Sequence, residues 1–344
     1  MTVRVSLRAI AEDAPGPRWA AAFERAWPGY RAWYLRGGGA SLPSYVECRR
    51  ALRKHMPELV PTWQRLVELC GGGDVEARFL SMWCPPPYIA GCSQTVWIDP
   101  RRGGEPALVR NYDFAPALLE GSWLATRWHG ARVAALGDCG WGVLDGINAG
   151  GLALSLSFGG RTVAGSGFGI PLVLRYVLET CETVAAAVEV LKRVPVHMTY
   201  SVTLLDSQAD WATVFVAPDR APEVSRQRAV TNFQHRVEWP QHARATHAVE
   251  RLERLDALAG AGAAAGLDDL VAAMLHPPLY QTSWERGYGT LYTAVYRPRS
   301  ATVELLWPGE LWRQRLDTFT EGERELVFAS QPGARGDLGS PQAS

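Results

Sequence analysis

Three consecutive prolines, Pro85 to Pro87, divide this chain into two parts that differ in their apolar patterning. Proline lacks a backbone donor and clashes with the preceding helical turn, so a run of three ends any helix. Before it, apolar residues recur at three- and four-residue spacing, which predicts helices. These predicted helices are Trp19–Tyr34, Tyr45–Leu69 and Val75–Trp83.

After the prolines, short β-branched or aromatic runs bounded by Gly, Pro or Asp predict strands. They are Thr95–Ile98, Ala107–Val109, Val133–Leu136, Leu152–Phe158, Ser201–Leu205, Ala212–Val216, Ala229–Thr231, Leu291–Tyr296 and Thr302–Leu306. Three helical blocks interrupt them: Leu172–Val194, broken near residues 180–183, Ala243–Leu258 and Leu267–Leu275. Strands grouped in this way predict α+β layers and not a regular βαβ alternation.

Composition excludes several classes of function. The 344 residues are 47% hydrophobic with a formal net charge of zero, so a large core is expected and a nucleic-acid or anionic-membrane partner is not. No apolar run is long enough for a signal peptide or a membrane span, which predicts a cytoplasmic protein. The six cysteines are scattered without a C-x-x-C pair, so neither a metal nor another cofactor is expected.

Four short motifs follow one another in the body of the chain. They are Ala90–Thr95 (AGCSQT), Val109–Phe114 (VRNYDF), Asp145–Leu152 (DGINAGGL) and Val230–Phe233 (VTNF). In this order they resemble the acyl-coenzyme A:6-aminopenicillanic acid acyltransferase family, which comprises peptidase C45-type N-terminal-nucleophile hydrolases. They are also similar to its relatives, the choloylglycine hydrolases and penicillin V acylases. The resemblance covers about residues 92–308.

The resemblance implies an αββα fold, with two stacked antiparallel sheets between helical layers. It also implies a proenzyme that cuts itself between Gly91 and Cys92. Residues 1–91 would then form a helical prosegment that stays with the body as its partner, and residues 92–328 would form the catalytic body. The last residues, 329–344, are rich in Gly, Pro, Ser and Gln and are predicted to be disordered. A homo-oligomer is a further expected assembly.

The chemistry of Cys92 agrees with this implication. A thiol can attack the preceding carbonyl, here that of Gly91, and glycine has no Cβ to block the attack. The released Cys92 would carry an α-amine, whose reference pKa of about 7.7–8.0 suits a general base. Lys192 is the only lysine of the body, so a side-chain amine is not expected as the base.

The resemblance also implies roles for five further residues. Asp113 contacts the nucleophile's amine, Arg110 lies beside the thiol, Asn232 donates to the oxyanion, Asn148 positions substrate or oxyanion, and Arg251 braces the site. Other interpretations are a strand-end ion pair for Arg110 and Asp113, a turn at Asn148 and a solvated Arg251. Strand alternation also places Arg110 and Asp113 on different faces unless a bulge intervenes.

Substrate contacts are the least constrained prediction. Candidate contacts are Asn111, Phe114, Trp123 and Trp128, besides Arg251; the aromatic ones suit an apolar acyl group, although core packing explains aromatic residues equally well. The expected substrate is a linear amide or acyl thioester: an N-acyl amino acid, a peptide, or an acyl-CoA or acyl-amine. Water or an amine would resolve the Cys92 thioester, giving hydrolysis or acyl transfer.

Two rival hypotheses use the same residues. In the first, the chain stays uncut and a thiol pairs with a histidine, with His129, His235 and His242 available. Cys84 and Cys139 are the alternative nucleophiles in that case. In the second, the chain is a non-catalytic, ligand-binding member of the fold.

Overall fold

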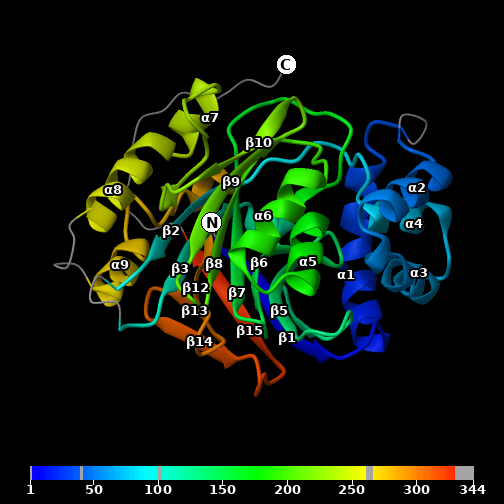
Figure 1. The fold of residues 1–344 in the computed structure, drawn as a ribbon, viewed down its shortest axis with the longest axis horizontal. Helices are drawn as coiled ribbons and strands as arrows, with labels where there is room; N and C mark the ends of the chain where they lie inside the picture. The colour runs from blue at the N-terminus through cyan, green and yellow to red at the C-terminus, as the bar shows by residue number, and fades with distance from the viewer. Residues whose placement is uncertain (1, 39–41, 100–102, 261–265, 330–344) are drawn as a thin grey trace.

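The computed structural model describes residues 2–38, 42–99, 103–260 and 266–329, and within them two β-sheets lie face to face between helices (Figure 1). Polar side chains join the two sheets across their interface. Gln94 Nε2 donates to Thr203 Oγ1 at 2.8 Å, and Ser155 Oγ donates to Gln94 Oε1 at 2.8 Å. The predicted αββα sandwich is confirmed.

The larger sheet has nine described strands. Their order is β10 (Arg220–Ser225), β9 (Trp211–Ala217), β8 (Tyr200–Asp206), β7 (Leu152–Phe158), β6 (Gly142–Asn148), β5 (Val133–Asp138), β4 (Ser122–Thr126), β1 (Thr2–Glu12) and β15 (Gly322–Ala329). The six described strands of the smaller sheet run β11 (Ala229–Val230), β2 (Gly91–Trp97), β3 (Ala107–Phe114), β12 (Gly289–Arg297), β13 (Thr302–Trp307) and β14 (Glu310–Arg315).

Helices cover the outer face of each sheet (Figure 1). The larger sheet is covered by α5 (Ile170–Thr180) and α6 (Val184–Arg193), and the smaller by α8 (Ala248–Gly260) and α9 (Leu267–Met274), with α7 (Pro240–Ala245) before α8. The predicted break near residues 180–183 is confirmed, because Thr183 caps α6 by accepting from Ala186 N. No described helix is both long and apolar enough to cross a membrane.

The leader, residues 1–91, is helical where predicted, except that the predicted helix Tyr45–Leu69 is broken at Met56, before Pro57; these helices lie together at one end of the sandwich (Figure 1). They are α1 (Pro17–Tyr34), α2 (Tyr45–His55), α3 (Val60–Leu69) and α4 (Asp74–Ser81). Short 3-10 turns among the described residues include η2 (Pro57–Leu59), η3 (Pro116–Leu118) and η5 (Trp284–Arg286). Rings of Trp27, Tyr30 and Tyr34 surround Phe79, with centroid distances of 5.1, 5.2 and 5.6 Å. This aromatic cluster buries the apolar faces that the spacing predicted.

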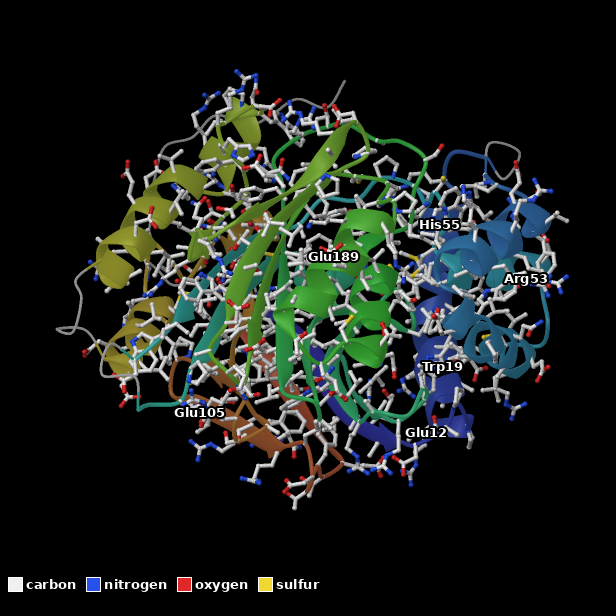
Figure 2. The ribbon with its side chains drawn as sticks, viewed as in Figure 1. Glu12, Trp19, Arg53, His55, Glu105 and Glu189 are labelled. Carbon is white, nitrogen blue, oxygen red and sulfur yellow. The ribbon has the colours of Figure 1, made fainter. Side chains whose placement is uncertain are left out.

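A wholly helical leader was the wrong expectation at its start, where β1 is a strand. It pairs in parallel with β4 and antiparallel with β15, so the larger sheet is mixed and not purely antiparallel. Apolar and polar residues alternate along β1, with Val3, Val5, Leu7 and Ala9 as the apolar ones. This two-residue period is typical of a half-buried strand. At its end, Glu12 accepts from Trp19 N at 2.8 Å and supplies a cap for α1; Figure 2 labels both residues.

Two half-buried carboxylates, Glu120 and Asp138, join the leader to the body. Tyr30 Oη of α1 lies 2.6 Å from Glu120 Oε2 and 2.9 Å from Asp138 Oδ1, and it accepts from Cys139 N at 2.8 Å. Burial, followed by the neighbouring Glu120 carboxylate, raises the pKa of Asp138 from 3.8 to about 7. The leader is therefore attached through a group that titrates near neutral pH.

We expect Asp138→Asn to flatten the pH dependence of stability. Between pH 4 and 7 the folded wild type keeps a proton that the unfolded chain releases, so its free energy of unfolding falls as pH rises through this window. The fall should amount to roughly 1–3 kcal/mol, at about 1.4 kcal/mol per pKa unit discounted for partial exposure. Urea unfolding at pH 5 and pH 7.5 measures it. Asp268→Asn, at an exposed site, should keep the wild-type slope; an unchanged slope in Asp138→Asn would contradict the prediction.

Candidate active site

Cys92 is the second residue of β2, directly after the leader, and its side chain is fully buried. The prediction that it stands at the start of a strand is confirmed. In the antiparallel pairing of β2 with β3, Gly91 lies opposite Asp113, Cys92 opposite Tyr112, and Gln94 opposite Arg110. Side chains opposite one another share a face of the sheet, so this register decides which groups can meet the thiol.

Arg110 reaches the thiol of Cys92 on the face that looks toward the larger sheet. Its Nη2 lies 3.1 Å from Cys92 Sγ, as the predicted role requires. Burial raises the pKa of the Cys92 thiol, and the Arg110 guanidinium opposes part of that rise. The thiol of the continuous chain is thus protonated at neutral pH, with a cation in place to stabilise a thiolate.

Asp145, on β6 of the larger sheet, holds Arg110 in this position. Arg110 Nη1 donates to the Asp145 carboxylate and to Leu144 O at 2.8 Å. The same carboxylate accepts from the hydroxyls of Tyr292, at 2.8 Å, and Tyr296. Sequence reasoning quoted Asp145 within a motif and assigned it no role. An acidic residue inside the apolar run of β6 was the available signal, because such a charge needs a partner when buried.

Asp113 lies on the opposite face of β3, as the alternation predicted. Its carboxylate accepts from Arg251 Nη1, on α8, and from Thr290 Oγ1 at 2.6 Å. Arg251 is fully buried and not solvated. The structure therefore separates Arg110 and Asp113, which do not form an ion pair with each other, and brings Arg251 into the site from a helix.

Asn232 contacts the backbone nitrogen of Cys92. Its Oδ1 accepts from Cys92 N at 3.1 Å and from Arg251 Nη2 at 2.8 Å. Two donors fix which end of the amide faces Cys92. The amide NH₂ points the other way, to Ser157 Oγ at 3.2 Å and Phe158 O at 3.5 Å. Asn232 therefore orients the nitrogen of Cys92 in the continuous chain, and its role as an oxyanion donor stays a prediction.

Asn148 is not brought to the site. Its Nδ2 donates to Leu178 O at 2.8 Å and Cys181 O at 2.6 Å, while its Oδ1 accepts from Leu152 N at 3.0 Å. These bonds tie the end of β6 to the end of α5 and use the whole amide. The interpretation as a turn residue is the one that fits.

Three of the predicted substrate contacts also serve the structure elsewhere. Asn111 Nδ2 donates to Met274 O and Leu279 O, at 2.8 and 3.0 Å. Trp123 packs edge-on against Trp312, with 5.4 Å between ring centroids, and Trp128 Nε1 donates to Glu12 O at 3.0 Å. Phe114 closes β3, where its ring lies 5.8 Å from that of Tyr112, next to the site.

No histidine hydrogen-bonds to Cys92 in the part of the chain that the structure describes. His235 pairs with Glu223 at 3.2 Å, and His242 stacks on Trp239 with 5.0 Å between ring centroids. Burial lowers the pKa of His242 to about 4, so it is neutral. Cys139 is buried at a positive φ of 57°, and burial raises the pKa of its thiol. The arrangement disfavours the Cys–His hypothesis.

The sequence profile of one protein family matches this chain. The family is described as acyl-coenzyme A:6-aminopenicillanic acid acyl-transferase, and the match covers residues 101–312, well over half of the 344 residues. The matched range includes Arg110, Asp113 and Asn232 and begins after Cys92. No curated protein sequence matches the chain.

Solved structures with a similar fold come from several organisms. A mutant conjugated bile acid hydrolase from Clostridium perfringens has a TM-score of 0.49 and 12% identity, over 71% of this chain and 100% of that one. Penicillin V acylase from Agrobacterium tumefaciens gives 0.41 and 19%, over 62% and 82%. The N-acylethanolamine-hydrolyzing acid amidase ortholog of Caenorhabditis elegans gives 0.44 and 17%, over 60% and 93%.

We expect Asp145→Asn to lower the free energy of unfolding by about 3–5 kcal/mol, because it leaves the buried Arg110 charge without its partner. Chemical denaturation measures the change. Glu189→Gln, which breaks the exposed pair with Lys192, should cost less than about 1 kcal/mol. Adding Arg110→Met to Asp145→Asn should recover part of the loss. A loss of less than about 1 kcal/mol in Asp145→Asn would contradict the prediction, because it would mean that Arg110 does not depend on the Asp145 charge for its stability in the interior.

Proposed function

We propose a reaction for this chain, which belongs to the acyl-coenzyme A:6-aminopenicillanic acid acyl-transferase family and is an enzyme of the amide hydrolase or acyltransferase class. It cuts itself between Gly91 and Cys92, and the freed Cys92 then attacks the carbonyl of a linear amide or acyl thioester. One observation carries the proposal. The thiol of Cys92 meets a guanidinium while its nitrogen meets an amide oxygen, so both atoms of the reacting residue are oriented.

The first step of self-cleavage needs only groups that surround Cys92, and the second step needs water. Cys92 Sγ attacks the carbonyl carbon of Gly91, the C–N bond breaks, and the thiol proton ends on the nitrogen of Cys92. Water then hydrolyses the thioester, releasing the Gly91 carboxylate and restoring the thiol. Asn232 Oδ1, which already accepts from Cys92 N, is placed to hold the nitrogen as it becomes an amine. Arg110 stabilises the sulfur as it loses its proton.

The processed enzyme would use the new α-amine as its general base. A free α-amine has a reference pKa of about 7.7–8.0, so it can take the thiol proton near neutral pH. Asp113, Arg251 and Asn232 form one hydrogen-bonded group that ends on this nitrogen. The acidic and amide members of that group favour the ammonium that forms when the amine accepts the proton.

The acyl-enzyme is a thioester on Cys92, and two fates follow from its chemistry. Water gives hydrolysis of an N-acyl amino acid or peptide, and an amine gives acyl transfer. The family description names an acyl-coenzyme A donor and an amine acceptor. That description supports a thioester donor for this chain. An amide donor would give the same thioester on Cys92, with the amine leaving as it takes up the thiol proton. The leader, residues 1–91, would remain as the enzyme's second chain in the cytoplasm.

We expect intact-protein mass spectrometry to find two wild-type fragments that meet at Gly91 and Cys92, because Arg110 and Asn232 orient the thiol and the nitrogen of Cys92. Cys92→Ala should give one uncut chain without activity, and Cys92→Ser should cut slowly. Cys70→Ala, which changes a half-buried cysteine at the end of α3, should be processed like the wild type. Amidase activity in an uncut wild type would refute the proposal in favour of the Cys–His hypothesis.

A further inference from the structure

The hydroxyl of Tyr288 lies against the α-carbon of Gly91. A Cβ built on Gly91 would stand 1.7 Å from Tyr288 Oη, 2.9 Å from Tyr288 Cζ and 3.3 Å from Asp113 Cβ. Real Cβ atoms essentially never come within 3.0 Å of another heavy atom, so a substituent on the L side of this α-carbon would require the Tyr288 side chain to move. Gly91 is therefore a glycine because of what it packs against.

The segment that carries Tyr288 is held on both sides. Tyr288 N donates to Ser283 O at 3.2 Å. Gly289 lies under the Trp284 indole, where a Cβ would meet the ring at 2.3 Å. Thr290 Oγ1 donates to the Asp113 carboxylate at 2.6 Å. The backbone of Tyr288 is thus tied to the same carboxylate group that belongs to the candidate active site.

The Tyr288 hydroxyl is itself buried and has no hydrogen-bond partner among the described residues, although part of the ring reaches the surface. Burial, followed by the Asp113 charge, raises the pKa of Tyr288, so the hydroxyl stays neutral. Its effect on whatever lies beside it is therefore steric and polar, not ionic.

We propose that Tyr288 determines specificity for the acyl group, admitting acyl groups with an unsubstituted α-carbon and excluding those with an L-side α-substituent. The inference rests on the proposed self-cleavage. In that step Gly91 is the acyl group, because its carbonyl carbon is the one attacked, so its α-carbon marks the position of a substrate's α-carbon. The same sulfur attacks both carbonyls, and the two acyl groups must approach it alike. The accepted class is glycyl, arylacetyl and straight-chain acyl groups, and L-alanyl groups are excluded.

Self-cleavage tests the steric contact without any added substrate. Gly91→Ala should slow processing at least about tenfold, since the new methyl meets Tyr288. Adding Tyr288→Ala should restore processing to within a few fold, and adding Tyr288→Phe, which removes only the closest atom, should restore it in part. Gly103→Ala, where nothing lies within 4 Å, is the matched control.

The outcomes separate the two proposals. An uncut wild type overturns the proposed function and this inference with it. A wild type that is cut, with a Gly91→Ala variant cut at the same rate, overturns this inference alone. A Gly91→Ala chain that Tyr288→Ala and Tyr288→Phe both fail to rescue, while the Tyr288→Phe single variant is itself processed normally, also overturns it, because the block would then lie elsewhere.

The processed enzyme tests the extension to substrates. Purified two-chain enzyme is mixed with the phenyl thioester of N-acetylglycine or of N-acetyl-L-alanine, and acylation of Cys92 is followed by intact mass. The wild type should be acylated by the glycine compound at least about tenfold faster, and Tyr288→Phe should reduce that ratio. Equal rates with both compounds, or no acylation by either, would overturn the assignment.

Discussion

Two buried ion pairs, Arg110 with Asp145 and Arg251 with Asp113, hold the arrangement around Cys92. All four side chains are fully buried. Removing such charges from water costs as much as their attraction returns, so pairs of this kind contribute little net stability. Their effect is geometric: neither partner can turn away without leaving an uncompensated charge in the interior. The position of the thiol's guanidinium and of the carboxylate beside Gly91 is fixed in this way.

The pairs lie on opposite faces of one strand, and Cys92 uses both. Its side chain points to the inner face of the sheet, where it contacts Arg110. Its backbone nitrogen donates to Asn232, and Arg251 bonds to both Asn232 and Asp113. A residue at the start of a strand is suited to this, since its backbone nitrogen is not yet committed to the middle of a ladder. The groups around the sulfur are thus separate from those around the nitrogen. The cationic Arg110 lies beside the sulfur, and the amide oxygen of Asn232 lies beside the nitrogen.

Features of the fold and of the candidate site could be predicted from the sequence where they depend on residues close together in the chain. Local periodicity predicted the helices of the leader, the break before α6 and the alternation that parts Arg110 from Asp113. The alternating residues of β1 carried an equally local signal that was overlooked. The partners of Arg110 and of Asn232 come from strands and helices far along the chain, and no spacing encodes them. For Asn148 the sequence left a turn residue and an amide donor in the site both open, because the two look alike in sequence, and its hydrogen bonds fit the turn.

The position of β1 in the larger sheet determines what assembly self-cleavage would produce. This strand of the leader lies between β4 and β15 and is hydrogen-bonded to both, and among the described strands it is the one that joins β15 to the rest of the sheet. A cut at residue 91 would thus divide one chain into two, present in a one-to-one ratio and joined through a continuous sheet. If the two chains separated, the edges of β4 and β15 that pair with β1 would become exposed, and exposed strand edges promote aggregation. The cut would remove one covalent bond, and the strand pairing of β1 with β4 and β15 would still hold the two chains together.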